Sequence, residues 1–142
     1  MNKPANIYIV ENHPLVLHLL QEVIGRQPQL RVCGAVSTAE EALQQLPHVA
    51  AALVLVDLSL PGMSGIELIQ TLQIQDPALP CLVLSGHQDF SYVQRALRAG
   101  ARGYLTKDNP FELLPAIQQV LQGKLYLSAS LRNSAHLINS PL

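Results

Sequence analysis

Cysteine and charged residues are both scarce in this sequence of 142 residues. Only two cysteines occur, and charged residues make up 13% of the chain. Two thiols are too few for a disulfide-stapled fold, so we interpret Cys33 and Cys81 as small buried residues with free thiols. The net charge of -1 excludes a uniformly basic surface for nucleic acid or anionic lipid.

Long apolar runs and common catalytic motifs are also missing. No run approaches the roughly 18 residues that span a bilayer, and the start, MNKPANIYIVENHP, lacks the apolar stretch of a signal peptide. The histidines show no zinc-ligand spacing, and neither a Gly-rich phosphate loop nor a Gly-x-Ser-x-Gly motif occurs. With 49% apolar residues, the chain can still build a core. We therefore expect a soluble, cytoplasmic domain without membrane contact.

Short apolar runs alternate with segments of helical periodicity. Two of the runs, 53–56 and 81–84, are continuously apolar, as strands covered on both faces are. Alternating strands and helices predict an α/β fold with a parallel sheet, here as five strand–helix units. The expected strands are 6–10, 30–36, 52–57, 80–85 and 101–106, and the expected helices are 13–26, 38–47, 64–75, 88–99 and 109–123.

Cap residues indicate where several of these helices begin. Thr38 and Ser64 each precede a glutamate by three residues, which is the capping-box pattern. Asn109 is followed by proline, the pair typical of an N-cap and first helical position. Pro115 would remove a backbone hydrogen bond inside the last helix, so we expect a bend or a late helix start there.

Polar residues collect at the carboxyl ends of the expected strands, where open α/β sheets bind their ligands. Two carboxylates and an amide oxygen suit Mg²⁺, which keeps several waters for a phosphate ligand. A hydroxyl and an ammonium suit phosphate oxygens, and a carboxylate can act as the nucleophile that forms an acyl phosphate. Asp57 directly follows an apolar run, and a cation and an ammonium beside it would offset its desolvation. In chain order these residues are Glu11, Asn12, Asp57, Ser85, Gly86 and Lys107.

Four motifs carry a family resemblance. They are V-E-N-H-P at Glu11, V-D-L-S-L-P-G-M-S-G at Asp57, L-S-G-H at Ser85 and Y-L-T-K-D at Lys107. Through these motifs the chain resembles, over residues 5–123, the receiver domain of two-component response regulators. The first and last motifs are similar to those of the NarL/FixJ (LuxR-type) subgroup.

The resemblance implies a fold and a domain organisation. We expect a flavodoxin-like (βα)5 fold, in which a doubly wound sheet of five parallel strands has the order 2-1-3-4-5. The receiver domain is expected in residues 1–123. Residues 124–142 are then a linker or a short extra helix, with the output domain absent or removed.

The resemblance also implies a role for each pocket residue. Asp57 would be the phosphoacceptor for a sensor histidine kinase, and Ser59 and His87 lie where the family tunes dephosphorylation. The other implied roles are Mg²⁺ ligands (Glu11, Asn12, Asp57 and the main-chain oxygen of Ser59), phosphate-binding residues (Ser85, Gly86 and Lys107) and a switch pair (Ser85 and Tyr104).

A receiver domain of this kind is a signalling module and catalyses only its own phosphoryl transfer and dephosphorylation. The implied output is control of transcription, with DNA contacted only through an output domain that this chain does not contain. A homodimer formed on phosphorylation would use an apolar helix face, such as that of the first or the last helix.

Asn12 departs from the family pattern, which usually has a second acid at this position. The amide keeps an oxygen ligand but removes a negative charge, so we expect weaker Mg²⁺ binding.

Asn12 also supports an alternative function, a phosphorylation-independent pseudo-receiver that acts as a protein-binding module. A second alternative, a haloacid-dehalogenase-like phosphatase, needs an acid where Ser59 stands. His13 is expected beside the pocket, and we interpret it as a helix-start residue in preference to a ligand.

Overall fold

Parallel strands form the centre of the computed structural model, which describes residues 3–132. Within these residues the sheet has six strands in the order β2-β1-β3-β4-β5-β6. The strands are β1 (Ala5–Val10), β2 (Leu30–Val36), β3 (Leu53–Asp57), β4 (Cys81–Ser85), β5 (Gly103–Thr106) and β6 (Tyr126–Leu127).

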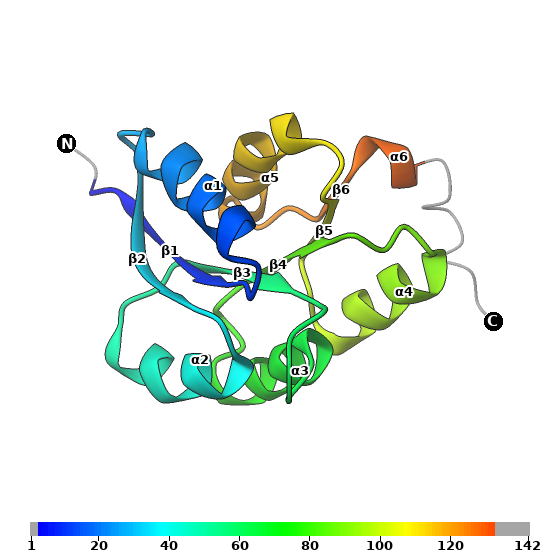
Figure 1. Ribbon diagram of the computed structural model, residues 1–142, viewed down its shortest axis with the longest axis horizontal. Helices are drawn as coiled ribbons and strands as arrows, with labels where there is room; N and C mark the ends of the chain where they lie inside the picture. The colour runs from blue at the N-terminus through cyan, green and yellow to red at the C-terminus, as the bar shows by residue number, and fades with distance from the viewer. Residues whose placement is uncertain (1–2, 133–142) are drawn as a thin grey trace.

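Helices cover both faces of this sheet (Figure 1). They are α1 (Pro14–Gly25), α2 (Ala39–Gln45), α3 (Gly65–Gln75), α4 (Phe90–Ala99), α5 (Leu113–Leu121) and α6 (Ala129–Arg132). Helices α1 and α5 lie on one face, and α2, α3 and α4 lie on the other. Alternate residues of β1 point to opposite faces of the sheet and pack into two separate cores. Ile7 and Ile9 pack under α1 and α5. Tyr8 and Val10 pack toward α2 and α3. None of the helices between residues 3 and 132 is long and apolar enough to cross a membrane.

The three residues predicted as N-caps each accept a hydrogen bond from a backbone N–H in the structure. Ser64 forms a full capping box with Glu67 at the start of α3, and the Thr38 hydroxyl accepts the N–H of Glu41. Asn109 caps a short 3-10 turn, η2 (Pro110–Glu112), and α5 follows only at Leu113. The predicted late helix start before Pro115 is therefore confirmed.

The prediction of five strands is wrong, because β6 adds a sixth. Its residues pair in parallel with the outer edge of β5, Tyr126 opposite Gly103 and Leu127 opposite Tyr104. The chain reaches this edge after Gly123, which has a φ of +86°. The pairing satisfies backbone groups that would otherwise be left unpaired on β5, and it buries Tyr126 and Leu127. A two-residue strand is too short to show any periodicity in a sequence.

The segment after Gly123 is therefore part strand and part short helix, α6. Residues 133–142, the rest of the segment predicted as a linker or extra helix, lie outside the described residues. The domain boundary at residue 123 stays a prediction.

Strand register sets which polar residues meet. Val10 of β1 lies opposite Val56 of β3, so Glu11 and Asp57, the next residues along each strand, come side by side. Asp57 lies opposite Leu84 of β4, one residue before Ser85. The carboxyl edge of the sheet thus becomes a polar pocket.

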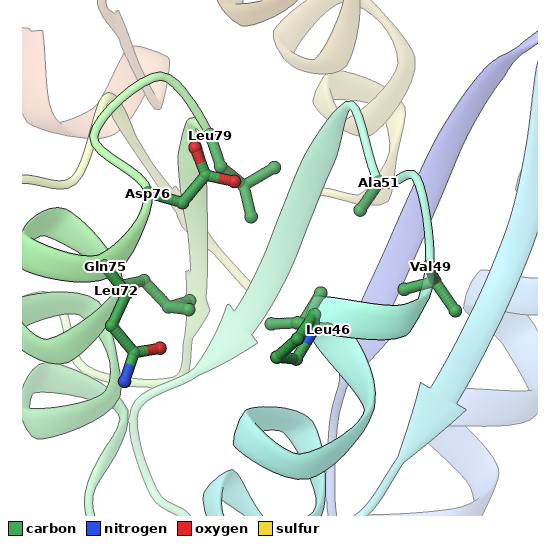
Figure 2. Close-up of a pocket in the computed structure, with 8 residues that line it drawn as sticks. Leu46, Val49, Ala51, Leu72, Gln75, Asp76 and Leu79 are labelled. Atoms are coloured by element: carbon green, nitrogen blue, oxygen red, sulfur yellow. The ribbon is translucent and has the colours of Figure 1, made fainter.

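The opposite edge carries a hollow of a different kind. It has a volume of about 190 Å³ and lies between the segment before β3 and the end of α3 (Figure 2). Its walls are mainly aliphatic, with Asp76 as the only ionisable side chain in its lining. This hollow therefore lacks the several polar and charged side chains that collect at the carboxyl edge.

Candidate functional site

Two buried carboxylates form the centre of the carboxyl edge. Glu11 is 1% exposed and Asp57 is 2% exposed. Both are held by backbone geometry, because the N–H of Glu11 donates to Val36 of β2 and Asp57 is the last residue of β3. Burying two carboxylates together is costly unless cationic groups compensate them.

Two cationic or potentially cationic side chains approach the carboxylates. Lys107 Nζ lies 3.2 Å from Glu11 Oε1 and 3.6 Å from Asp57 Oδ2. His13 Nδ1 lies 2.9 Å from Glu11 Oε2 and 3.6 Å from Asp57 Oδ2. The two oxygens of Glu11 are thus divided between Lys107 and His13, and the same oxygen of Asp57 faces both.

The pKa values of the two neighbouring carboxyl groups move in opposite directions. Burial raises the pKa of Asp57, and the neighbouring Glu11 raises it further, while the Ser59 N–H and the Lys107 ammonium lower it only in part. Burial also opposes ionisation of Glu11, but the neighbouring Asp57, hydrogen bonds with His13 and the charge of Lys107 together hold the pKa of Glu11 below its usual value. A proton is therefore held on Asp57 more readily than on Glu11, and a bound cation can take its place.

Several oxygen atoms in the pocket have no hydrogen-bond partner within the described residues. They are Glu11 Oε1, Asn12 Oδ1 and Asp57 Oδ2, and all three are buried. The other oxygen of Asp57, Oδ1, accepts the N–H of Ser59 at 3.0 Å. Carboxylate and amide oxygens are the donors that Mg²⁺ prefers, so the residues present fit this ion.

An open hollow of about 410 Å³ lies over the carboxylates. His13, Ser59, Gly86, His87 and Lys107 line it, together with Val16. A phosphoryl group and a hydrated ion are small enough to enter such a space.

Ser85 and Tyr104, the predicted switch pair, meet through the main chain of His87. The Ser85 hydroxyl accepts the His87 N–H at 3.0 Å, and the Tyr104 hydroxyl donates to the His87 carbonyl at 2.8 Å. The His87 ring stacks on Tyr92 with centroids 4.2 Å apart, and its Nε2 lies 3.4 Å from the Ser59 hydroxyl. A movement of the segment after β4 would therefore reach both Ser85 and Tyr104.

The structure brings most of the sequence-predicted residues to one pocket. Glu11, Asp57 and Lys107 are in direct contact, with Asn12, Ser59, Ser85 and Gly86 around them. Tyr104 is fully buried and lies behind this group, with its hydroxyl on His87.

His13 is a pocket residue that the sequence interpretation undervalued. It is the N-cap residue directly before α1, as expected for a helix-start residue, but its ring makes no helix-capping hydrogen bond and contacts Glu11 instead. The available signal was its spacing, since a residue two positions after a strand-end acid can reach back to it.

Gly65 is a second residue that was missed. A Cβ at this position would collide with the Asp57 carbonyl oxygen and would lie 2.8 Å from the Leu58 Cα. The first turn of α3 thus packs directly on the main chain of the central carboxylate.

The fold and the pocket together define a class, the flavodoxin-like α/β proteins with an acidic site at the carboxyl edge of the sheet. Within this class, the chain belongs to the response regulator receiver domain family, whose pattern it matches over residues 7–118. Members of this family are signalling modules, and the predicted resemblance is confirmed.

Relatives support the same subgroup. The nitrate/nitrite response regulator protein NarL of Escherichia coli (strain K12) is 32% identical over 130 residues, which cover 91% of this chain and 60% of NarL. The transcriptional regulatory protein UhpA of Salmonella typhimurium is 33% identical over 123 residues, which cover 86% of this chain and 61% of UhpA. The chain thus spans about three fifths of the length of these relatives.

A solved structure agrees with these relatives. The LuxR-family two-component response regulator from Aurantimonas sp. SI85-9A1 superposes with a TM-score of 0.88 at 32% identity. The match covers 92% of this chain and 94% of that one. The predicted NarL/LuxR-type subgroup is therefore confirmed.

Proposed function

We propose that Asp57 accepts a phosphoryl group from a sensor histidine kinase and that the chain is the phosphorylation-switched part of a transcriptional regulator. The observation that carries this proposal is the Asp57 carboxylate itself. It is buried, one of its oxygens lacks a hydrogen bond within the described residues, and it lies beside Lys107 under an open hollow. A carboxylate oxygen that has no competing hydrogen bond can act as a nucleophile toward phosphorus.

Mg²⁺ and the pocket side chains would have different roles in the transfer of the phosphoryl group. Mg²⁺, when bound, neutralises negative charge on the phosphoryl group. We assign its ligands as Glu11, Asn12, Asp57 and the main-chain oxygen of Ser59. An oxygen of Asp57 forms a bond to phosphorus while the bond from phosphorus to the donor's imidazole nitrogen breaks. The same side chains support hydrolysis of the product, with Ser59 and His87 at the rim of the site.

We assign the transferred phosphoryl group to a second set of residues, Lys107, Ser85 and Gly86. Lys107 Nζ contacts the carboxylate and can pair with a phosphoryl oxygen, and the Ser85 hydroxyl and the Gly86 backbone can donate hydrogen bonds to the others. We propose that Ser85 moves toward the phosphoryl group when it donates this bond, and away from the His87 N–H that its hydroxyl accepts here. Because Tyr104 is bonded to the same residue, we propose that it changes position with Ser85 and passes the change to the surface of α4 and β5.

The assembly of the regulator is part of the proposal. Helix α1 has an exposed apolar face that suits a homodimer formed on phosphorylation. Its residues are Leu15, Leu19 and Val23, which are 71%, 53% and 38% exposed.

We place the receiver domain in residues 1–123. DNA binding would belong to an output domain outside this chain, and the protein would act in the cytoplasm, where a kinase domain and promoter DNA are found.

Phosphoryl labelling tests the function. The protein is incubated with acetyl phosphate or phosphoramidate and Mg²⁺, and the phosphoryl mass increment is measured. Wild type and the control Asp76→Asn, which changes an exposed aspartate, should label, whereas Asp57→Asn should not. Equal labelling of Asp57→Asn refutes the assignment. If wild type stays unlabelled even at high Mg²⁺, the pseudo-receiver function replaces this one.

A further inference from the structure

A nitrogen donor stands beside the two buried carboxylates. His13 Nδ1, Glu11 Oε2 and Asp57 Oδ2 all lie within 4.8 Å of one another. The two separations from the ring nitrogen are 2.9 Å and 3.6 Å. Neighbouring ligands that each lie ~2.1 Å from one octahedral ion are ~3.0 Å apart. Small side-chain rotations would therefore let all three atoms contact one ion.

The buried oxygen of Asp57 points to a ligand independently of this clustering. Asp57 is 2% exposed, and its Oδ2 has no hydrogen-bond partner in the described part of the chain. Lys107 contacts the Oε1 side of Glu11, whereas His13 contacts the Oε2 side. A cation bound on the Oε2 side would satisfy Asp57 Oδ2 without displacing Lys107 from Glu11.

The His13 ring is available as a ligand. Its side chain is 57% exposed, and it makes no capping hydrogen bond to α1. When Nδ1 bonds only to Glu11, this nitrogen carries the proton, because an ionised carboxylate can only accept. Metal ligation needs the other tautomer, with the proton on Nε2, and a half-exposed ring can exchange tautomers through water.

We propose that His13 is a ligand of the cation at this site and that it shifts the site's preference toward transition-metal dications such as Co²⁺ and Zn²⁺. The proposal rests on the metal site of the proposed function and extends its ligand set. Imidazole suits Zn²⁺ and other late first-row ions, whereas Mg²⁺ prefers oxygen ligands. Asn12 acts in the same direction, because an amide in place of an acid gives a hard ion less negative charge.

Metal titrations of the 142-residue chain test this ligand. Wild type, His13→Asn and the control His18→Asn are each titrated with Co²⁺ and with Mg²⁺. Asparagine is itself a favoured N-cap, so α1 keeps its start in His13→Asn, and His13→Gln provides a second variant. His18 lies on the same helix and is 66% exposed. Mutating even second-shell partners of a metal costs about 10–100-fold in affinity, so the Co²⁺/Mg²⁺ affinity ratio should fall at least about tenfold in both His13 variants and stay constant in His18→Asn.

A spectroscopic readout on wild type needs no variant. Adding Zn²⁺ should shift the ¹⁵N resonance of His13 Nδ1, as expected for direct ligation. An unchanged Nδ1 resonance overturns the proposal. So does an unchanged Co²⁺/Mg²⁺ ratio in the His13 variants, or an equal fall in His18→Asn, which would indicate adventitious surface binding only.

Labelling in Mg²⁺ separates this proposal from the proposed function. If acetyl phosphate labels Asp57 and the His13 variants keep the wild-type affinity ratio, only the His13 ligand is overturned. If the ratio falls as expected and Asp57 is never labelled, the ligand stands and the proposed function fails.

Discussion

Replacing Lys107 with methionine should destabilise the protein in a way that depends on pH. The Lys107 ammonium lies 3.2 Å from one buried carboxylate and 3.6 Å from another. At an effective dielectric constant of about 20, each contact contributes about 5 kcal/mol of gross attraction. Desolvation of the ammonium offsets part of this, and in the variant a carboxyl group can take up a proton instead. We therefore expect Lys107→Met to lower the free energy of unfolding by about 2–3 kcal/mol near neutral pH.

The sign of the pH dependence follows from the carboxyl pair. The pKa of Asp57 is already raised in the folded protein, and loss of the ammonium raises it further. Above about pH 4 the folded variant then holds a proton that the unfolded chain has released. Because the folded state binds more protons, its stability falls as the pH rises through this window. The deficit of Lys107→Met should be small near about pH 4 and largest above neutrality.

Urea denaturation of wild type, Lys107→Met and Lys124→Met at several pH values measures this effect. Lys124 is exposed, so Lys124→Met should match wild type throughout. Millimolar Mg²⁺ should recover part of the deficit of Lys107→Met, because the ion binds the folded state and replaces the missing positive charge. A deficit that is the same at all pH values, or absent near neutrality, would refute the electrostatic reasoning.

Three further predictions concern the same pocket. Asp57→Asn should raise the melting temperature near pH 7 and leave it unchanged near about pH 4. The reason is that the raised pKa of Asp57 means that its ionised form destabilises the fold. A lower melting temperature at pH 7 contradicts this. Asn12→Asp should tighten Mg²⁺ binding by about 5–30-fold, since a buried amide oxygen becomes a charged ligand. Isothermal titration calorimetry measures the Mg²⁺ affinity of both proteins, and an unchanged affinity contradicts the charge argument. Gly65→Ala should cost about 1–3 kcal/mol of stability and slow the labelling of Asp57, because its Cβ meets main-chain atoms that cannot give way. Its control is Gly25→Ala, where nothing lies within 4 Å of the added Cβ, and equal behaviour of the two variants would rule out the steric explanation.

Five of the strands were predictable because their patterns are local. A continuously apolar run such as 53–56, in a chain where such runs alternate with helix-period segments, favours a strand covered on both faces, and its end places Asp57 at the sheet's carboxyl edge. The same argument predicted Glu11 and Lys107 at that edge. Strand β6 could not be predicted, because its two residues carry no pattern and are held by segments distant in sequence, among them the free edge of β5.

The sequence by itself determined the α/β order, the family and the set of strand-end polar residues, since these depend on periodicity and on residue type at a given position. The tertiary structure alone decided how the pocket's charges pair. It placed Lys107 and His13 on different oxygens of Glu11, left Asp57 Oδ2 without a hydrogen bond within the described residues, and packed Gly65 on the Asp57 carbonyl. Side-chain direction and close approach depend on strand register and on packing between segments distant in sequence, and no local pattern records either.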